Sequence, residues 1–444
     1  MPPRGIAASF WRGGTSRGLL FRAETLAPYP PAVRDAIILT SLGSPDPAGR
    51  QIGGLGGGVS SLSKAAIVSV PGEGKEAQEV YGKLPGVEWA DAGKLPGAEK
   101  PPGLQWDLVY RSAQVGVKKA ELDWTASCGN MFTAAALQAL SVPLLPYSTI
   151  FSRSRSLSRP EPDQPLMFPL SILSASNGAL MRARVPLDPI TLLPWVPEPG
   201  KGVEIAGVPG RDEPGVEVEM PLDGAGEGGT GLVTGRPVDM VKLEDGKEVE
   251  ISFLTSGLPN IFLPVAQLRR LIPSLPPNLL TLPASALASF PSLTSTLESV
   301  RTAAAAQFSV PCSLASPKIV LVGEVPVEGY SASTGERVQY HEADLLARAV
   351  SSGDWHATIP GTTLGALNVG AGSPGTVVHS LVRGAPPAGV KDEVVTVRAA
   401  HAAGVAESSV RFEEGRPRSV VMVRTAREIM RGEVMVPDRV FWEN

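Results

Sequence analysis

Cysteine and histidine are scarce in this chain. Its 444 residues include two cysteines, Cys128 and Cys312, and four histidines. Two cysteines cannot build a disulfide framework, and neither a CxxC nor an HxxxH spacing occurs, so we expect no structural zinc site. Free thiols suit a reducing compartment, where either of them can react. We therefore expect a cytoplasmic protein that requires no metal.

A strong charge of one sign and long apolar runs are also missing. Forty basic and 44 acidic residues leave a net charge of −4, which offers no electrostatic footprint for nucleic acid. No apolar run approaches the ~20 residues of a membrane span. Residues Met1–Phe10 also lack the pattern of a secretory signal. The 43% of hydrophobic residues can fill a core, which excludes a wholly disordered protein.

Glycine (48) and proline (43) are abundant, so we expect many short elements joined by turns. Helices are predicted for the Ala-rich segment Asn130–Leu140, for Tyr340–Val350 and for Gly361–Ala371. Strands are predicted for runs that are mostly β-branched and bounded by Gly or Pro, which are Ala65–Val70, Val249–Phe253, Asn260–Pro264, Lys318–Val322, Gly375–Val382, Glu393–Arg398 and Ser419–Val423. This composition indicates a β-rich mixed α/β protein.

Three segments have the composition of loops or insertions. Lys75–Pro102 is rich in Gly, Pro, Lys and Glu, and Leu187–Gly228 alternates Pro, Gly and charge. We place the domain boundary in the first part of the latter. Ser152–Pro165 is a Ser/Arg tract, which is typical either of a solvated loop or of a phosphorylated or nucleic-acid-binding tail. Its short, isolated occurrence favours the solvated loop.

A glycine-rich patch, Gly53–Lys64, invites comparison with a phosphate-binding loop. The match fails because Ser63 precedes Lys64 and Ala65 follows it, whereas a Walker motif needs Lys directly after Gly. A glycine turn that brings backbone N–H groups close to an anion remains possible. Ser60 and Ser63 add hydroxyl groups there. Lys64 enters an apolar strand, either as a snorkelling surface residue or as a desolvated base.

Two further patches open predicted helices. Cys128 stands at the start of the Ala-rich helix, where free N–H groups favour a thiolate and any bound carboxylate. The alternative is a small cysteine packed in the core. In the second patch Thr358, Gly361 and Thr362 either hold a second carboxylate or only cap their helix. His356 alone would most often be a structural histidine.

Eight blocks in this order resemble the methylaconitate and aconitate isomerases of the PrpF family. The resemblance covers nearly the whole chain. The blocks are Arg12–Gly18 (RGGTSRG), Gly54–Val68, Cys128–Asn130, Ser256–Phe262, Ser316–Ile319, His356–Thr363, Pro374–Val378 and Arg424–Gly432.

The resemblance implies an α+β fold like that of diaminopimelate epimerase. Two pseudo-symmetric halves, residues 1–188 and 189–444, would each wrap a curled β-sheet around a central helix, and terminal strands can cross between them. The active site would lie in the cleft between the halves, with Cys128 facing His356–Thr363.

The resemblance also implies an activity, that of a cofactor-independent isomerase. Such an enzyme moves or flips a C=C bond in a small unsaturated di- or tricarboxylate by proton abstraction and reprotonation. Lys64 would be the base and Cys128 the partner acid or second base. The remaining matched positions would bind the substrate: Thr15, Ser16, Arg17, Gly57, Gly58, Ser60, Ser63, Gly129, Asn130, His356, Thr358, Gly361 and Thr362.

Alternative functions stay open beside the isomerase. The chain can be a non-catalytic accessory protein that supports an aconitase-like dehydratase, or a biosynthetic-cluster isomerase with a different carboxylate substrate. Retention of both Lys64 and Cys128 favours an enzyme. We expect a small carboxylate as partner, neither nucleic acid nor membrane, and a possible homo-oligomer. The Pro/Gly/Ser-rich texture suggests a fungal member.

Overall fold

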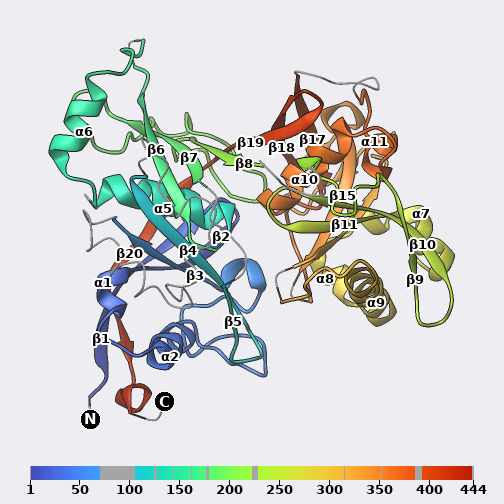
Figure 1. Ribbon diagram of the computed structural model, residues 1–444, viewed down its shortest axis with the longest axis horizontal. Helices are drawn as coiled ribbons and strands as arrows, with labels where there is room; N and C mark the ends of the chain where they lie inside the picture. Colours follow the sequence, from blue (N-terminus) through green and yellow to red (C-terminus); the bar gives the residue numbers. More distant parts are fainter. Residues whose placement is uncertain are drawn as a thin grey trace. The chain divides into compact units, whose positions relative to one another are not determined.

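The chain folds into two compact units (Figure 1). The computed structural model describes residues 2–70, 106–124, 128–142, 144–161, 163–176, 180–222, 229–314, 316–351, 353–385 and 393–442. Unit 1 comprises Met1–Ile205, Gly210–Met220 and Val423–Asn444, and unit 2 comprises Ala206–Pro209 and Pro221–Met422. Unit 1 therefore continues past residue 188, where the sequence analysis places the boundary, to Ile205, and it also includes two later segments. The predicted loop Lys75–Pro102 lies outside the described residues.

Unit 1 is built on one curled sheet. Its strands lie in the order β20 (Ala426–Val436), β1 (Arg4–Gly13), β2 (Ser16–Arg22), β3 (Lys64–Ser69), β4 (Leu108–Val115), β6 (Leu166–Ser174), β7 (Leu180–Leu187) and β8 (Val216–Pro221). The β2–β3 and β4–β6 pairs are parallel, and the other pairs in this series are antiparallel. A short strand, β5 (Leu122–Asp123), also pairs with β4.

Unit 2 repeats this series of pairings. Its strands lie in the order β9 (Asp239–Lys242), β10 (Glu248–Thr255), β11 (Pro259–Pro264), β12 (Lys318–Gly323), β15 (Leu345–Ser351), β17 (Val394–His401), β18 (Gly404–Glu413) and β19 (Arg416–Arg424), with parallel β11–β12 and β15–β17 pairs. Short β16 (Asp354–Trp355) pairs with β15, as β5 does with β4. A small hairpin of β13 (Tyr330–Ser331) and β14 (Arg337–Val338) stands apart.

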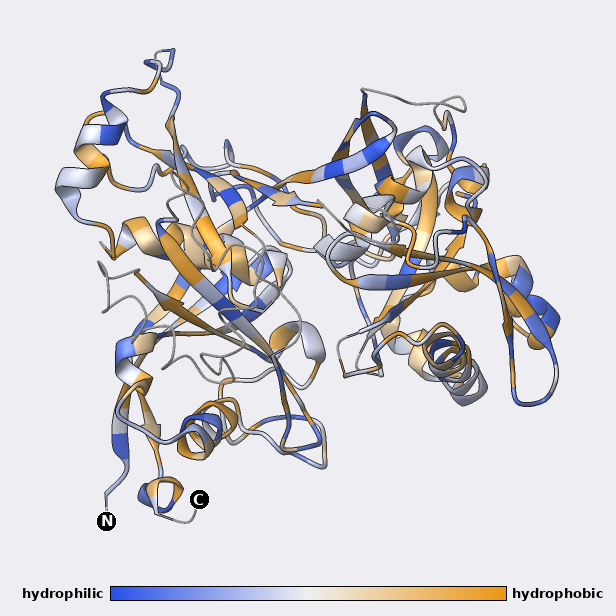
Figure 2. Ribbon diagram, viewed as in Figure 1, coloured by the Kyte–Doolittle hydropathy of each residue, from blue (hydrophilic) through white to orange (hydrophobic). Residues whose placement is uncertain are grey.

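Each sheet curls around one central helix. In unit 1, α5 (Gly129–Ser141) is buried over residues 129–140 and packs against β1, β2, β3, β4, β7 and β20. In unit 2, α10 (Gly361–Gly372) is buried along its whole length and packs against β10, β17 and β18. Small and apolar residues predominate on every side of both helices, so neither helix has a solvent-facing polar stripe. Figure 2 shows the mainly hydrophobic colour of α5.

The remaining helices lie outside the two sheets. In unit 1 these are α1 (Ala23–Leu26), α2 (Pro31–Ser41) and α6 (Tyr147–Ser154). The core beneath α2 joins Val33 and Ile37 to Phe21 and Ile67 of the sheet. In unit 2 they are α7 (Val265–Leu271), α8 (Ala284–Ala288), α9 (Pro291–Gln307) and α11 (Val377–Leu381). No helix among the described residues is long and apolar enough to cross a membrane.

The α+β fold class is confirmed, and most predicted strands are present. The predicted helices at 130–140 and 361–371 match α5 and α10. The prediction of a helix over Tyr340–Val350 is wrong, because only a 3₁₀ turn over Tyr340–Glu342 forms before β15. β15 is a central strand, because it pairs with β12 on one side and with β17 on the other. A short apolar run of this kind is compatible with a buried strand and with a buried helix, so the sequence pattern alone does not distinguish them.

Two other predictions are corrected. The predicted strand Gly375–Val382 instead contains α11, whose start is capped by the Thr376 hydroxyl accepting the N–H of His379 at 3.0 Å. The predicted loop at Ser152–Pro165 begins inside α6. Sequence analysis also missed α9, the 17-residue helix of unit 2. The buried Leu293, Leu297 and Val300 have helical spacing, but the many Ser and Thr residues between them resemble a loop.

Complete enclosure of α5 leads to a stability prediction. Ala135 of α5 is fully buried, whereas Ala306 of α9 is exposed. Ala135→Leu should overpack the core and lower the free energy of unfolding by about 1–3 kcal/mol. The matched Ala306→Leu should change it by less than ~0.5 kcal/mol. Urea unfolding followed by circular dichroism measures both, and equal effects would contradict the enclosure of α5.

Candidate functional site

The first turn of α5 is fixed through the backbone of Cys128. The Cys128 carbonyl accepts the N–H of Phe132 at 2.9 Å and the hydroxyl of Tyr110 at 2.8 Å. The Cys128 N–H donates to the Ser112 hydroxyl at 3.0 Å. Tyr110 and Ser112 are neighbours on β4, so the sheet sets where the helix begins. The half-buried Cys128 side chain makes no capping hydrogen bond and keeps its thiol.

The helix start leaves backbone donors without acceptors. Within the described part of the chain, the N–H groups of Gly129, Asn130 and Met131 have no hydrogen-bond acceptor. All three residues are buried, and the first turn contains no acidic side chain. Orphan N–H groups at a helix N-terminus, together with the helix dipole, attract an anion.

The β1–β2 hairpin lies directly against this turn. A Cβ on Gly13 would stand 2.1 Å from the Asn130 carbonyl oxygen, and a Cβ on Gly14 would stand 2.3 Å from Asn130 Oδ1. The Asn130 side-chain amide donates to the hydroxyls of Thr15 at 3.3 Å and Ser16 at 3.1 Å. Only glycine permits this approach. It brings together four predicted substrate-binding residues, Thr15, Ser16, Gly129 and Asn130, around Cys128.

Arg12 anchors the same hairpin. Its Nη1 donates to the carbonyl of Gly14 at 3.1 Å and to the hydroxyl of Thr425 at 2.9 Å. Its Nη2 lies 3.1 Å from a carboxylate oxygen of Glu213. Burial lowers the pKa of Arg12, and Glu213 opposes that shift. With a carboxylate already bound, Arg12 is suited to hold the turn in shape.

Lys64 is the first residue of β3 and stands in parallel register with Gly18. Its half-buried side chain donates from Nζ to Oε1 of Gln114 at 2.6 Å. The Gln114 amide in turn donates to the carbonyls of Ser60 at 3.1 Å and Ser63 at 3.0 Å. The amine of Lys64 is thus fixed by a hydrogen bond and partly buried. This places Lys64 between the snorkelling surface residue and the fully desolvated base that the sequence analysis considered.

Gln114 is a candidate site residue that the sequence analysis did not single out. It is the cross-strand partner of Lys64 on β4 and is buried. The available signal was a glutamine in a strand, Leu108–Val115, whose residues are otherwise mostly apolar. A buried amide needs several partners, and Gln114 finds them in the lysine and the glycine turn.

The predicted anion-binding glycines use their N–H groups inside the turn. Gly57 N donates to the Leu62 carbonyl at 3.1 Å, and Gly58 N donates to Oε1 of the fully buried Gln51 at 2.9 Å. The Gln51 amide also holds the Ser63 hydroxyl at 2.6 Å. These hydrogen bonds stabilise the turn itself. Because the N–H groups of Gly57 and Gly58 already have acceptors, they are not available to bind an anion.

Arg17 packs over this turn. Its Nη2 lies 2.9 Å from the position of a Cβ on Gly57, and its guanidinium stands 5.4 Å from the Phe10 ring centroid. The Arg17 Nε atom is buried and has no hydrogen-bond partner among the described residues. Arg17 is therefore a cation beside the glycine turn, and its Nε–H donor has no acceptor among the described residues.

The remaining predicted site residues belong to unit 2. His356 follows β16, and its N–H donates to the Ala349 carbonyl at 3.0 Å. Thr358 packs its methyl group against Gly207, where a Cβ would stand 2.5 Å away. The structure therefore places the predicted site residues in two groups, one in each unit.

The start of α10 repeats the arrangement at α5. Gly361 and Thr362 form its buried first turn, and in the described residues their N–H groups have no acceptor. Ser256 Oγ donates to the Thr362 carbonyl at 2.6 Å. Pro360 occupies the position that Cys128 has at α5. Unit 2 thus offers a similar anion-attracting turn without a thiol.

Lys318 corresponds to Lys64 in the repeated topology. It is the first residue of β12, it is 7% exposed, and it stands in register with Asn260. Asn260 Oδ1 accepts the Thr363 hydroxyl of α10 at 2.8 Å. Sequence analysis named its block but assigned Lys318 no role. Within the described residues, no cluster of three or more His, Cys, Asp and Glu side chains is placed to hold a metal ion.

Comparison with known proteins defines the class. Residues 4–83 and 99–437 match the family model described as PrpF protein. The chain therefore belongs to the PrpF family, as the sequence blocks indicated.

Particular relatives extend this assignment. The chain is 29% identical to the 2-methyl-aconitate isomerase of Shewanella oneidensis, with 97% of each chain covered. It is 28% identical to the 2-methyl-aconitate isomerase of Cupriavidus necator, with 99% of each covered. Among solved structures, the crystal structure of a methylitaconate-delta-isomerase superposes with a TM-score of 0.64 at 24% identity, covering 99% of this chain and 98% of that one. This last match shows a shared fold.

The close approach of Gly14 to Asn130 can be tested. Gly14 and Gly384 both have positive φ, +48° and +68°, but a Cβ on Gly384 meets nothing within 4 Å. Gly14→Ala should therefore cost at least ~1 kcal/mol more unfolding free energy than Gly384→Ala, which carries only the backbone strain. Parallel urea titrations measure the difference. Equal losses would show that the hairpin does not press on Asn130.

Proposed function

We propose that this protein is an isomerase that moves or flips a C=C bond in a small unsaturated di- or tricarboxylate. The observation that carries the proposal is the buried first turn of α5, where a free thiol and orphan N–H groups meet a hydroxyl-bearing hairpin. On the sheet beside this hairpin, an amide holds the amine of Lys64. The PrpF relatives are named as isomerases of this kind of acid.

The chemistry needs one base and one acid. The base removes a proton from an allylic carbon next to a carboxylate, which leaves a dienolate-like anion. Return of a proton at the far end of the conjugated system moves the double bond, and return after rotation changes its geometry. The proton count is unchanged, so no co-reactant is consumed. We assign the base to Lys64 and the acid, or second base, to Cys128.

Stabilisation of the anion falls to the backbone. The orphan N–H groups of Gly129, Asn130 and Met131 provide donors that need no rearrangement during the reaction. Ser16 and Thr15 stand next to them through the Asn130 amide. In unit 2, Gly361 and Thr362 offer a second turn of the same kind, with Thr358 and His356 preceding it.

A second candidate function is a non-catalytic accessory protein for an aconitase-like dehydratase. The intact pair of Lys64 and Cys128 favours the enzyme, because a chain that had lost its chemistry would be expected to lose one of them. An isomerase for a different carboxylate in a biosynthetic cluster is the nearer alternative. The fungal origin suggested by composition also stays a prediction, since the relatives named above are bacterial.

Substitution of the proposed base gives the decisive test. Lys64→Ala should fold but lose at least ~100-fold in turnover, the usual scale for a general base. Activity is followed as deuterium uptake by cis-aconitate and a panel of related acids in heavy water. Lys247→Ala is the matched control, since that lysine is exposed and its ion pair is with the exposed Asp245. Turnover of Lys64→Ala near that of wild type would remove Lys64 from catalysis.

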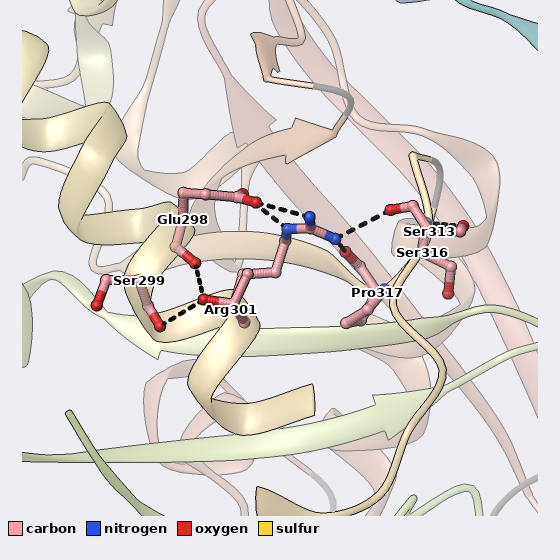
Figure 3. Close-up of polar contacts among 7 residues, drawn as sticks. Glu298, Ser299, Arg301, Ser313, Ser316 and Pro317 are labelled. Carbon is pink, nitrogen blue, oxygen red and sulfur yellow. Dashed lines mark hydrogen bonds and ion pairs between the residues drawn. The ribbon is translucent and has the colours of Figure 1, made fainter. Parts of the chain in front are cut away.

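The two cysteines allow a second test. Cys128 should be protected from alkylation by excess trans-aconitate, because a bound carboxylate occupies the same helix end. Cys312 is the internal control. It is exposed and interacts electrostatically with Arg301, whose guanidinium also binds Glu298 and the carbonyls of Ser313 and Pro317 (Figure 3). Cys312 is exposed and lies near a cation, so it can react quickly without belonging to a site. The quantity to compare is therefore how far trans-aconitate slows alkylation of each cysteine, and not which cysteine reacts faster.

Mass spectrometry of the alkylated protein separates the outcomes. Protection of Cys128 alone supports its place in the site, whereas labelling of Cys128 that ignores the ligand contradicts it. Cys128→Ser should keep most of the ligand affinity and lose most of the turnover, because a hydroxyl is a much poorer acid than a thiol. That split would place Cys128 in proton transfer and not in carboxylate recognition.

A further inference from the structure

Arg424 is a buried cation that no carboxylate among the described residues compensates. It is the last residue of β19 and is 7% exposed. Among the described residues, its guanidinium has one hydrogen-bond acceptor, the adjacent Val423 carbonyl at 2.8 Å. Burial lowers the pKa of Arg424 to about 10, and no acid among the described residues opposes that shift. The side chain therefore remains charged at neutral pH while most of its donors are unused.

Two other arginines with buried guanidinium groups, Arg12 and Arg348, have partners that Arg424 lacks, although Nε and Nη2 of Arg348 have no hydrogen-bond partner among the described residues. Arg12 is paired with Glu213. Arg348, which is 1% exposed, donates to the carbonyls of Leu280 and Leu282 and lies 6.0 Å from the Trp355 ring centroid. Arg424 has neither an acid nor such a set of carbonyls in the part of the chain that the structure describes.

The position of Arg424 is at the first turn of α5. Its Cδ lies 3.3 Å from the point that a Cβ on Gly14 would occupy, and Asn130 Oδ1 lies 2.3 Å from that same point. The next residue, Thr425, accepts the N–H of Gly14 at 2.7 Å. The turn between β19 and β20 therefore sets the arginine side chain beside Gly14, on which the side chain of Asn130 from the first turn of α5 also packs, and all three residues belong to unit 1.

We propose that Arg424 binds a carboxylate group of the ligand at the first turn of α5. An uncompensated buried guanidinium costs folding free energy, and a planar carboxylate is the partner that its fork of donors fits. The same carboxylate accepts from the orphan N–H groups, so cation and helix end act on one anion. The class of ligand rests on the proposed function, whereas the presence of an anion site rests on the geometry.

Three variants test the assignment. Arg424→Met removes the charge with similar volume, Arg424→Lys keeps the charge but loses the fork, and Arg348→Met is the matched control in unit 2. Isothermal calorimetry with trans-aconitate should show a loss of affinity of at least ~10-fold for Arg424→Met, as expected for a charge-assisted pair. Arg424→Lys should bind with intermediate affinity, and Arg348→Met should bind like wild type.

The melting temperature without ligand separates binding from structure. Arg424→Met should melt no lower than wild type, because it removes an unpaired buried charge. Arg348→Met should melt lower, because its carbonyl acceptors lose their donor. A merely structural role for Arg424 predicts the reverse, with a lower melting temperature and unchanged affinity. If Arg424→Met does not fold, affinity of Arg424→Lys equal to that of wild type overturns the proposal.

The outcomes also distinguish this inference from the proposed function. Wild-type protein that binds trans-aconitate through Arg424 but incorporates no deuterium into any acid of the panel would contradict the isomerase and leave the anion site standing. Wild-type protein that binds neither trans-aconitate nor the other di- and tricarboxylates would overturn the site itself. Retained affinity in Arg424→Met alongside active turnover would overturn only the role of Arg424.

Discussion

The enclosure of α5 by its own sheet is the constraint on which unit 1 depends. A helix buried on all sides has no polar stripe, so its length is built from small and apolar residues. Its start cannot be made apolar, because the first backbone N–H groups have no partner within a helix. A buried helix end without a capping side chain normally requires a ligand, water or another donor–acceptor pair. The fold thus creates a polar point inside the core of unit 1.

The neighbouring elements shape that point without neutralising it. Gly13 and Gly14 bring the hairpin against Asn130, so that Thr15 and Ser16 present hydroxyls there. Arg12 holds the hairpin and is itself held by Glu213. Unit 2 repeats the strand pairings and the buried helix start, but Pro360 replaces the cysteine. The shared topology therefore accounts for two anion-attracting turns, and the difference at one position gives only unit 1 a thiol.

The sequence predicted those parts whose signal is local. The Ala-rich helix after Cys128 and most of the β-branched strands are present, since composition and glycine boundaries determine them. The segment Leu345–Ser351 became a strand because β12 and β17 flank it, which no local pattern records. For a similar reason the sequence analysis did not single out Gln114, and it named Arg424 only as the start of a sequence block, without a role. Gln114 stands out because it pairs with Lys64 across two strands, and Arg424 because no acid among the described residues lies near it. Both features depend on tertiary structure and leave no local sequence pattern.

The charge arrangement follows from what an anionic ligand would need. Lys64 is held by a neutral amide, and Arg424 donates only to a backbone carbonyl among the described residues. A carboxylate in either place would stabilise the empty protein more, but it would compete with the ligand for the same donors. The carboxylate of Glu213 pairs instead with Arg12, which holds the hairpin, and with Arg427, the cross-strand neighbour of Arg12 on β20. Acidic side chains thus support the structure around the first turn of α5 and are kept from the donors that a carboxylate ligand would use.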